Sequence, residues 1–449
     1  MTDAPAERPR RTWKQTAAIY ATPVMLSMLV LGFASGLPLY MVFQKLSFWL
    51  RDAGIERSTI GFFYWVTLSY TLKFLWAPVV DRVRIPFLFK LLGARRSWIV
   101  TAISGTVIAL LIISQTDPAD GLLPVAIGAL LLAYSGATLD VAIDAWRIES
   151  APNDMQANMA AAYSLGYRFA YMTSGLGLAI SEWADWGWSF KAMALAMAIS
   201  AALVFLMKEP AAGLKKRDLD GPFPMKVARA VIEPFKQILG RLGLWFIPVI
   251  ALVAIYRLSD FTMGVMAAPL YSDIGFARDL VGGIQGGPGL AATIFGLFVG
   301  GVAAFRFGLP KALVIGLVIT FVTNGAYAWL AATAGPDDAG RLLVAVVGDN
   351  IAGGFVTTVF IAYLSSLVDP ENAATQYALL SSFYAFFAKF LSGFSGVLAD
   401  AVGWVWFFII TAGWTAPAAL LLFIVIRYGT DAARGAEVFE ERKTADESS

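Results

Sequence analysis

The chain has 449 residues, of which 58% are hydrophobic and 15% are charged, and its formal net charge at pH 7 is +2. Soluble domains contain roughly 45–50% apolar and about 25% charged residues, so a soluble enzyme of this length is excluded, because it could not keep so much apolar surface out of water. The nearly neutral charge gives no support for nucleic-acid binding.

The composition also limits the chemistry of any site, because the chain contains neither Cys nor His. It therefore has no disulfide, no thiolate nucleophile and no imidazole ligand for a metal ion. We expect no cofactor and no metal. A proton carried near neutral pH has to be held by a carboxylate that keeps its proton in that range.

Hydrophobic segments recur along the whole chain, and several, such as 17–43 and 280–305, contain no charged residue. Because about 18 such residues suffice to cross a bilayer as a helix, we predict an all-α polytopic membrane protein. The first apolar run is far longer than the roughly 7–15 residues of a signal-peptide core, so we expect it to be retained. The twelve predicted transmembrane helices lie at 18–42, 59–78, 97–115, 122–148, 158–181, 189–207, 244–270, 279–305, 311–334, 342–367, 375–399 and 402–427.

Basic residues indicate the orientation of the chain. Most of the 34 Lys and Arg residues fall on the same side as both predicted termini, and the central connection is especially basic. Positively charged loops stay in the cytoplasm, so both termini are predicted to be cytoplasmic. The predicted parts are a cytoplasmic tail 1–17, a six-helix bundle 18–207, a cytoplasmic central loop 208–243 with an interfacial helix, a second six-helix bundle 244–427 and a cytoplasmic polar tail 428–449.

Eight charged residues lie well inside predicted helices, where each costs about 2.5–3.5 kcal/mol if it stands alone. Four are acidic and four are basic, which allows a neutral network. In a two-fold repeated twelve-helix transporter, all of them would fall on helices that line the central cavity or the seam between the halves. This pattern favours a charged, water-filled cavity over purely structural ion pairs. The residues are Lys73, Asp140, Asp144, Arg168, Arg257, Asp260, Asp349 and Lys389.

The fourth predicted helix carries the strongest candidates for proton coupling. Asp140 and Asp144 are one helical turn apart on the same face. Two carboxylates at this spacing repel each other, and one of them can keep its proton near neutral pH. Asp140 or Asp144 is therefore the predicted proton carrier, with Asp260 and Asp349 as further candidates.

The cytoplasmic end of the same helix offers an alternative role for its charges. Asp144 and its neighbours could contact the basic connection between the second and third helices and close an inner gate. The predicted gate residues are Asp81, Arg82, Arg95, Arg96, Arg147 and Glu149.

Basic, amide and tyrosine side chains in the membrane are candidates for substrate binding. Arg257 and Asp260 are three residues apart, so they either neutralise each other or hold an anionic substrate group. Arg168 has no acid within one helical turn, which favours an anion site. The predicted substrate-binding residues are Arg168, Arg257, Lys73, Tyr167, Tyr163, Asn350, Gln376 and Lys389.

Short motifs are spread over the predicted helices. They include LGFASGLPL at 31–39, LKFLWAP at 72–78, DVAIDAW at 140–146 and LGYR at 165–168. Together with the basic linker between two six-helix halves, these motifs resemble the AmpG-type muropeptide permeases of the major facilitator superfamily.

The resemblance implies a major facilitator fold and a protein that is not an enzyme. It implies proton-coupled import of peptidoglycan turnover products, N-acetylglucosaminyl-anhydro-N-acetylmuramic acid with or without a stem peptide, for cell-wall recycling. The expected location is the bacterial inner membrane, and the expected partners are this substrate, protons and lipid. We expect a monomer.

The family also contains acetyl-CoA carriers, so the main alternative is a proton-coupled carrier of another organic anion or sugar, including acetyl-CoA. A membrane-embedded transferase is a weaker alternative, because the chain has no nucleotide motif and no His or Cys.

Overall fold

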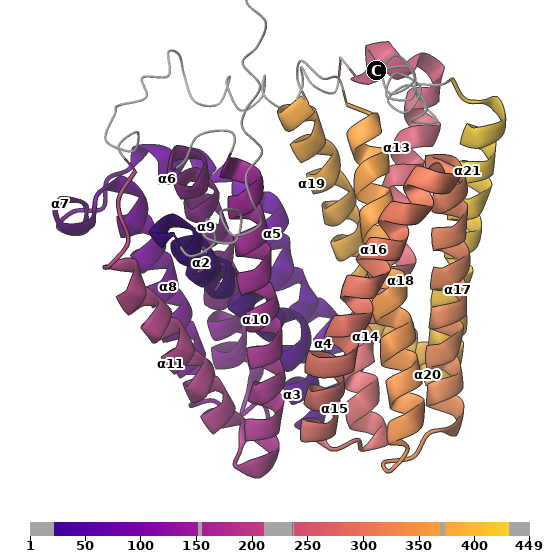
Figure 1. The fold of residues 1–449 in the computed structure, drawn as a ribbon. Coiled ribbons are helices and arrows are strands. Elements are labelled where there is room, and N and C mark those ends of the chain that lie inside the picture. The colour runs from indigo at the N-terminus through magenta and orange to yellow at the C-terminus, as the bar shows by residue number, and fades with distance from the viewer. Residues whose placement is uncertain (1–21, 151–154, 211–235, 237, 369–372, 431–449) are drawn as a thin grey trace, which may run out of the picture.

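The computed structural model describes residues 22–150, 155–210, 236, 238–368 and 373–430. All regular secondary structure in these residues is helical, and the helices form an N-terminal and a C-terminal bundle that lie side by side (Figure 1). The two predicted tails and the predicted interfacial helix of the central loop fall largely outside the described residues.

The N-terminal bundle begins with a long helix that contains one π-helical turn. This helix consists of α2 (Pro23–Tyr40), the π-turn Met41–Lys45 and α3 (Leu46–Asp52). The next pass is broken into short pieces joined by 3-10 turns at Tyr64–Thr67 and Lys73–Leu75. The remaining helices are α4 (Arg57–Phe63), α5 (Leu68–Leu72), α6 (Ala77–Arg82), α7 (Leu88–Leu92), α8 (Ala94–Ile113), α9 (Leu122–Ser150), α10 (Gln156–Trp183) and α11 (Trp186–Val204).

The C-terminal bundle also begins with an interrupted helix, because α13 (Phe246–Ile255) and α14 (Leu258–Ile274) are separated at Tyr256 and Arg257. A π-turn at Gln285–Gly289 joins α15 (Arg278–Ile284) to α16 (Leu290–Phe307). The other helices are α17 (Leu309–Thr333), α18 (Ala339–Ser366), α19 (Ala373–Ser392), α20 (Ser395–Gly413), which turns at Gly403, and α21 (Thr415–Tyr428).

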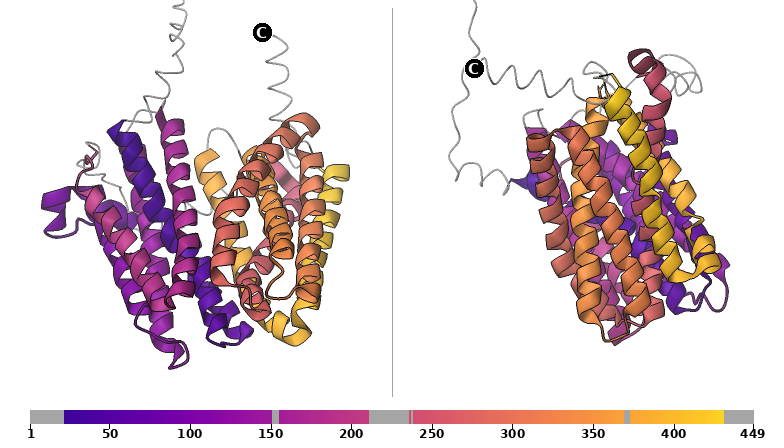
Figure 2. Two further views of the ribbon diagram at one scale, coloured as in Figure 1. Left: turned by 60° about the horizontal axis from the view of Figure 1, so that its bottom comes forward. Right: turned by 90° about the vertical axis from the view of Figure 1, so that its right-hand side faces the viewer.

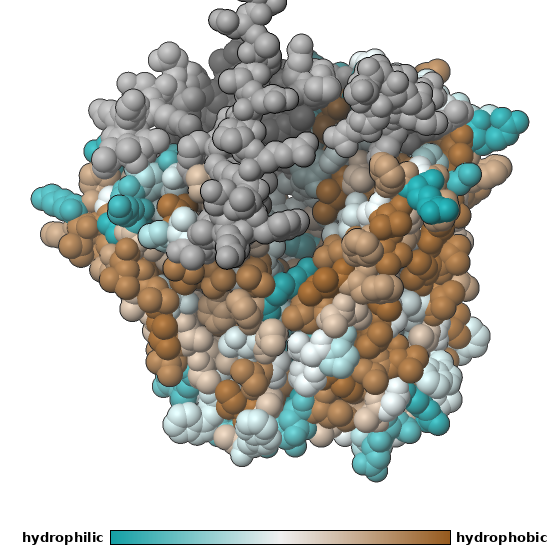
Figure 3. Space-filling model, viewed as in Figure 1, coloured by the Kyte–Doolittle hydropathy of each residue, from teal (hydrophilic) through white to brown (hydrophobic). Residues whose placement is uncertain are grey.

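The outer flanks of the molecule are apolar (Figure 3). Large hydrophobic side chains such as Leu123, Phe298 and Phe305 are exposed, as expected for a protein whose surface contacts lipid. In the described part of the chain, nine helical stretches are long and apolar enough to cross a bilayer. The predicted all-α membrane class is confirmed. The count of twelve stays a prediction, because the segments at α4–α6, α10 and α19 are broken or more polar than these nine.

The two bundles touch at one end and diverge toward the other (Figure 1; Figure 2, left). We call the end where α3 and α14 finish the Asp52 face, and the end where α2 begins and α21 finishes the Pro23 face. The bundles meet where α3 lies against α14, α4 against α20 and α10 against α15. Hydrophilic side chains are visible in the furrow between the diverging bundles (Figure 3).

Inside the N-terminal bundle, α2 packs very closely on α10. A Cβ atom at Gly166 would lie 2.0 Å from the carbonyl oxygen of Leu29, and one at Gly32 would lie 2.1 Å from the carbonyl oxygen of Tyr163. Small residues at such contacts let helix backbones approach each other in membranes. This packing brings Ser35 of α2 close to Tyr163 of α10, which matters for the site described below.

We predict that Gly166→Ala destabilises the protein by about 1–3 kcal/mol, because the added methyl group forces the two helices apart. The matched control is Gly325→Ala in α17, where an added Cβ would meet no atom within 4 Å of the described structure. The control should be neutral or slightly stabilising, since Ala favours a helix more than Gly does. Thermal midpoints of the detergent-solubilised variants measure both effects, and equal midpoints for the two variants would contradict the prediction.

Candidate functional site

A connected polar site lies inside the N-terminal bundle and centres on Asp140 in α9. One carboxylate oxygen of Asp140 accepts a hydrogen bond from the Ser35 hydroxyl, and the other accepts one from the Lys73 ammonium at 3.3 Å. The hydroxyl oxygens of Ser35 and Tyr163 are 2.7 Å apart. The Asp140 side chain is only 16% exposed. Three predicted site residues, Lys73, Asp140 and Tyr163, therefore form one network, and Ser35 joins them.

A break in the helix places Lys73 opposite Asp140. Lys73 begins the 3-10 turn that separates α5 from α6. Directly after this turn, the indole N–H of Trp76 donates to the Thr138 hydroxyl at 3.1 Å, and the Trp76 ring stacks on Tyr134 at a centroid distance of 4.7 Å. These contacts attach the turn to α9 two residues before Asp140, so they position the lysine for its ion pair.

Asp144 has a more open environment than Asp140. Its side chain is 54% exposed, and its carboxylate lies 3.5 Å from the guanidinium of Arg147 on the same helix. A solvent-exposed carboxylate with a single weak ion-pair partner loses little interaction energy when it is protonated. The two aspartates of α9 are therefore not equivalent.

The predicted gate residues lie near the Pro23 face. Arg95 pairs with Glu149 at 2.8 Å, and Arg96 lies 3.7 Å from Glu209. Arg95 and Glu149 both belong to the N-terminal bundle, and Glu209 follows the last helix of that bundle, so neither pair reaches the C-terminal bundle. The side chains of Asp81 and Arg82 lie outside the described residues.

A cavity of about 280 Å³ lies between the two bundles. On its C-terminal wall, Arg257 occupies the break between α13 and α14, 3.4 Å from the carboxylate of Asp260. The Arg257 guanidinium also lies 5.5 Å from the centre of the Phe261 ring. The opposite wall comes from α2, its π-turn and the start of the second pass. The cavity is lined by Leu39, Tyr40, Phe43, Gln44, Tyr64, Arg257, Asp260, Phe261 and Gly264.

Sequence reasoning missed the N-terminal wall of this cavity. Tyr40 and Gln44 lie at the π-turn of the first helix, where one extra residue per turn changes which side chains face the seam. Gln44 lies two residues beyond the predicted end of the first membrane helix at 42, so the sequence prediction placed it outside the membrane. Tyr40 is 5.6 Å from Tyr167, and Tyr167 is 5.8 Å from Tyr163, measured between ring centres. A line of tyrosines thus joins the cavity to the Asp140 network.

Lys389, a predicted substrate-binding residue of the C-terminal bundle, reaches across the seam and contacts the N-terminal bundle. Its ammonium donates to the carbonyl oxygen of Thr67 at 3.3 Å and lies 5.4 Å from the centre of the Phe43 ring. The carbonyl belongs to the 3-10 turn Tyr64–Thr67 of the N-terminal bundle. The Lys389 side chain is 8% exposed, so this contact is buried.

The other predicted residues lie apart from the cavity lining. Asn350 is engaged within its own bundle, since its amide accepts from the Thr293 hydroxyl and donates to a backbone carbonyl in α18. Gln376 is 1% exposed. Arg168 and Asp349 are partly exposed, and neither makes an ion pair with any described side chain.

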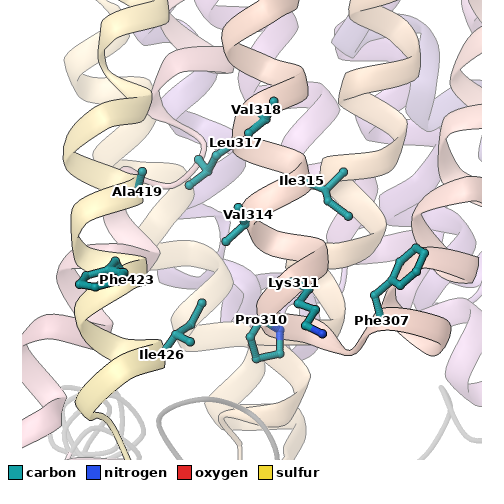
Figure 4. Close-up of a pocket in the computed structure, with 10 residues that line it drawn as sticks. All are labelled: Phe307, Pro310, Lys311, Val314, Ile315, Leu317, Val318, Ala419, Phe423 and Ile426. Carbon is teal, nitrogen blue, oxygen red and sulfur yellow. The ribbon is translucent and has the colours of Figure 1, made fainter.

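A larger groove of about 660 Å³ lies between α17 and α21 (Figure 4). Its walls are hydrophobic apart from Lys311, and it contains none of the predicted site residues. A polar substrate would find few hydrogen-bond partners there. The cavity between the bundles is therefore the better candidate site.

Comparison with known proteins agrees with this architecture. Residues 24–333 and 249–446 match the model of the Major Facilitator Superfamily. The chain is 30% identical to "Putative transporter AmpG 4" of Rickettsia felis, over 89% of this chain and 95% of the relative. It is 31% identical to "Anhydromuropeptide permease" of Escherichia coli K12, over 91% of this chain and 81% of the relative.

The fold is also that of solved transporters. The crystal structure of a D-xylose–proton symporter aligns with a TM-score of 0.64 at 14% identity, over 93% of this chain and 99% of the symporter. At that identity the likeness concerns the fold alone. The family-model match and the relatives at 30–31% identity show that the chain belongs to the major facilitator superfamily, and within it to the AmpG-type permeases, and it is therefore a membrane transporter and not an enzyme.

Proposed function

We propose that this protein is a proton-coupled importer of peptidoglycan turnover products, N-acetylglucosaminyl-anhydro-N-acetylmuramic acid with or without a stem peptide. It would act as a monomer in the bacterial inner membrane, with both termini in the cytoplasm. Relatives named as anhydromuropeptide permease and as AmpG transporters support this substrate class. The observation that carries the proposal is the cavity between the bundles, which has an arginine on one wall and tyrosine and amide side chains on the other.

The chemistry of the cavity suits such a ligand. Arg257 can bind a carboxylate through charge-assisted hydrogen bonds, such as the lactyl carboxylate that is free in the disaccharide without a stem peptide or a carboxylate of the stem peptide itself. Gln44 can exchange hydrogen bonds with an N-acetyl group, and the Tyr40 and Tyr64 rings can stack on sugar faces. The volume of about 280 Å³ is near the lower end of small-molecule sites, so it fits one sugar with its substituents. We infer that the rest of the ligand extends into the furrow toward the Pro23 face.

Asp140 is the proposed proton carrier. It is paired with Lys73 and Ser35, so a proton on its carboxylate would break an ion pair inside the bundle and free the lysine. A proton on Asp144, which is 54% exposed, would change fewer contacts. Asp260, which pairs with Arg257 at the cavity, would link substrate binding to the second bundle.

The conformation fits the inward-facing step of alternating access. Rocking of two repeated halves around a central site is the general mechanism of such transporters. The bundles are closed at the Asp52 face and diverge toward the Pro23 face. With the orientation inferred from the basic loops, the Pro23 face is cytoplasmic, and the furrow opens to the cytoplasm.

The first test is uptake of radiolabelled anhydromuramoyl disaccharide into proteoliposomes, with and without an inward proton gradient. Accumulation above the external concentration is expected only with the gradient. The control uses the same liposomes with a protonophore added. If the folded protein takes up acetyl-CoA or a simple sugar instead of the disaccharide, the proposed substrate is wrong and the alternative carrier function replaces it.

The proton role predicts a specific defect in Asp140→Asn. Accumulation driven by the gradient should fall by about tenfold or more, whereas exchange of labelled for unlabelled substrate without a gradient should stay within about threefold of the parent protein. The matched variant Asp144→Asn should keep most of its accumulation. The opposite result for the two variants would assign the proton to Asp144.

The binding role of Arg257 predicts that Arg257→Gln raises the KM for the disaccharide by about 10–100-fold, because a charge-assisted contact to the substrate carboxylate is lost. An analogue with a carboxamide in place of that carboxylate should be affected by less than about threefold. Arg341→Gln is the control, since Arg341 pairs with Asp338 in its own bundle, away from the cavity. Equal losses for the acid and the amide would show that Arg257 only supports the structure.

A further inference from the structure

Two sequence elements occur once in each half of the chain, both at the Asp52 face. The first is D-x-G-x-x-R, found at 52–57 and again at 273–278. The second is an acid followed by W-x-W-x-F, with three residues between the acid and the first Trp, found at 182–190 and at 400–408. Together they supply two acids, one Arg and the W-x-W pair at the same end of each bundle, and the first Trp of this pair contacts the other members.

In the N-terminal bundle, one acid from each element and the Trp form a socket that holds an arginine of the other bundle. Arg278 donates to Asp52 at 3.1 Å and to Glu182 at 2.9 Å. Its guanidinium lies 5.4 Å from the centre of the Trp186 ring. The indole N–H of Trp186 donates to Asp52 at 2.8 Å, which fixes the carboxylate in place. We call Asp52, Glu182 and Trp186 the N-socket.

The C-terminal bundle repeats this arrangement with the roles exchanged. Arg57 of the N-terminal bundle donates to Asp273 at 2.8 Å and lies 3.9 Å from Asp400. Its guanidinium lies 4.2 Å from the centre of the Trp404 ring. The indole N–H of Trp404 donates to Asp273 at 2.7 Å. We call Asp273, Asp400 and Trp404 the C-socket.

The glycine of D-x-G-x-x-R explains how acid and arginine serve opposite sockets. Gly54 has φ +80° and Gly275 has φ +86°, in the left-handed region that glycine adopts without strain. Each therefore ends one helix and reverses the chain before the next. The acid stays on the helix that ends, and the arginine begins the next helix, where it faces the other bundle.

The two sockets are similar but not identical. Arg51 adds a second arginine to the C-socket, donating to Asp273 at 3.0 Å, whereas the matching position in the other half is Ser272. Arg57 and Arg278 are 19% and 22% exposed, so their contacts are partly shielded from water. Charge-assisted hydrogen bonds combined with an aromatic ring are stronger than an isolated surface ion pair.

We propose that the two sockets form a reciprocal latch that closes the Asp52 face and sets the equilibrium between this conformation and one open at the Asp52 face. Each arginine is held by residues of the opposite bundle, so a rigid-body opening breaks both sockets together. The latch is a property of the two bundles and does not depend on which substrate the protein carries.

The test measures the distance between the bundles at the Asp52 face. Because the chain contains no cysteine, spin labels can be attached at Asp120→Cys and Asp337→Cys, two exposed positions in opposite bundles, without removing native residues. Pulsed electron–electron double resonance on the substrate-free protein in nanodiscs then gives the distribution of distances between the two labels. The populations of the longer and shorter distances give the ratio of open to closed forms.

Arg278→Gln should raise the open-to-closed ratio about fivefold, and Arg57→Gln should raise it less, because Arg51 still occupies the C-socket. The double variant should raise the ratio by about the product of the two single effects, since both sockets break in one motion. The control Arg341→Gln removes an arginine on the same face that pairs within its own bundle, and it should leave the ratio unchanged.

An unchanged distance distribution in the double variant would overturn the proposal, as would an equal shift in the Arg341 control. If an arginine variant does not fold, Trp186→Phe keeps the ring and all charges but removes the indole donor to Asp52. It should raise the ratio by a smaller amount, about twofold, and no change would again count against the latch.

Discussion

A charge inside a membrane has to be paired or has to reach water, and this constraint organises the whole transporter. The interior pairs Lys73–Asp140 and Arg257–Asp260 each lie within one bundle, so the bundles can move relative to each other without separating these charges. Among the described residues, the ion pairs between the bundles lie at the Asp52 face, where water can solvate the charges once they part. Lys389 crosses the seam in the interior, but its partner there is the carbonyl of Thr67, a neutral group. The placement of charges thus favours rocking of two rigid halves.

The same constraint explains why helices break at the site. Lys73 lies in a 3-10 turn, Arg257 lies between α13 and α14, and Gln44 lies in a π-turn. Irregular backbone is tolerated at membrane depth only where it is buried in protein or lines a cavity, and here each break lies at the seam or next to Asp140. These breaks direct polar side chains inward while the outer faces of the bundles stay apolar.

The sequence was sufficient to predict the class of fold and to select several charged residues that the structure brings together at the candidate site. Lys73 and Asp140 were selected because isolated charges are costly in a membrane, and they are indeed paired. Tyr40 and Tyr64 could not be selected from a chain with so many aromatic residues, because helical periodicity does not reveal a π-turn or a 3-10 turn. Arg57 and Arg278 were used only to orient the chain, since a charge in a loop carries no cost and gives no signal by itself. The role of these arginines becomes visible only when the two halves are placed together, because each arginine contacts the repeated element of the opposite half.

One helix in each bundle carries both a cavity residue and a socket acid. The first is the α2–α3 helix, which has Tyr40 at the cavity and Asp52 in the N-socket; the second is α14, with Asp260 at the cavity and Asp273 in the C-socket. At 1.5 Å per residue these pairs are separated by about 18 and 20 Å along the helix. The first segment is part of one continuous helix, whereas Pro269 removes one backbone hydrogen bond from α14. A tilt at the cavity is therefore carried along the α2–α3 helix to the N-socket more rigidly than along α14 to the C-socket. Ser35, which bonds to Asp140, lies on the same α2–α3 helix. The α2–α3 helix therefore contacts the proposed proton carrier, lines the candidate cavity and carries one acid of the proposed latch, so a movement of this one helix would couple all three.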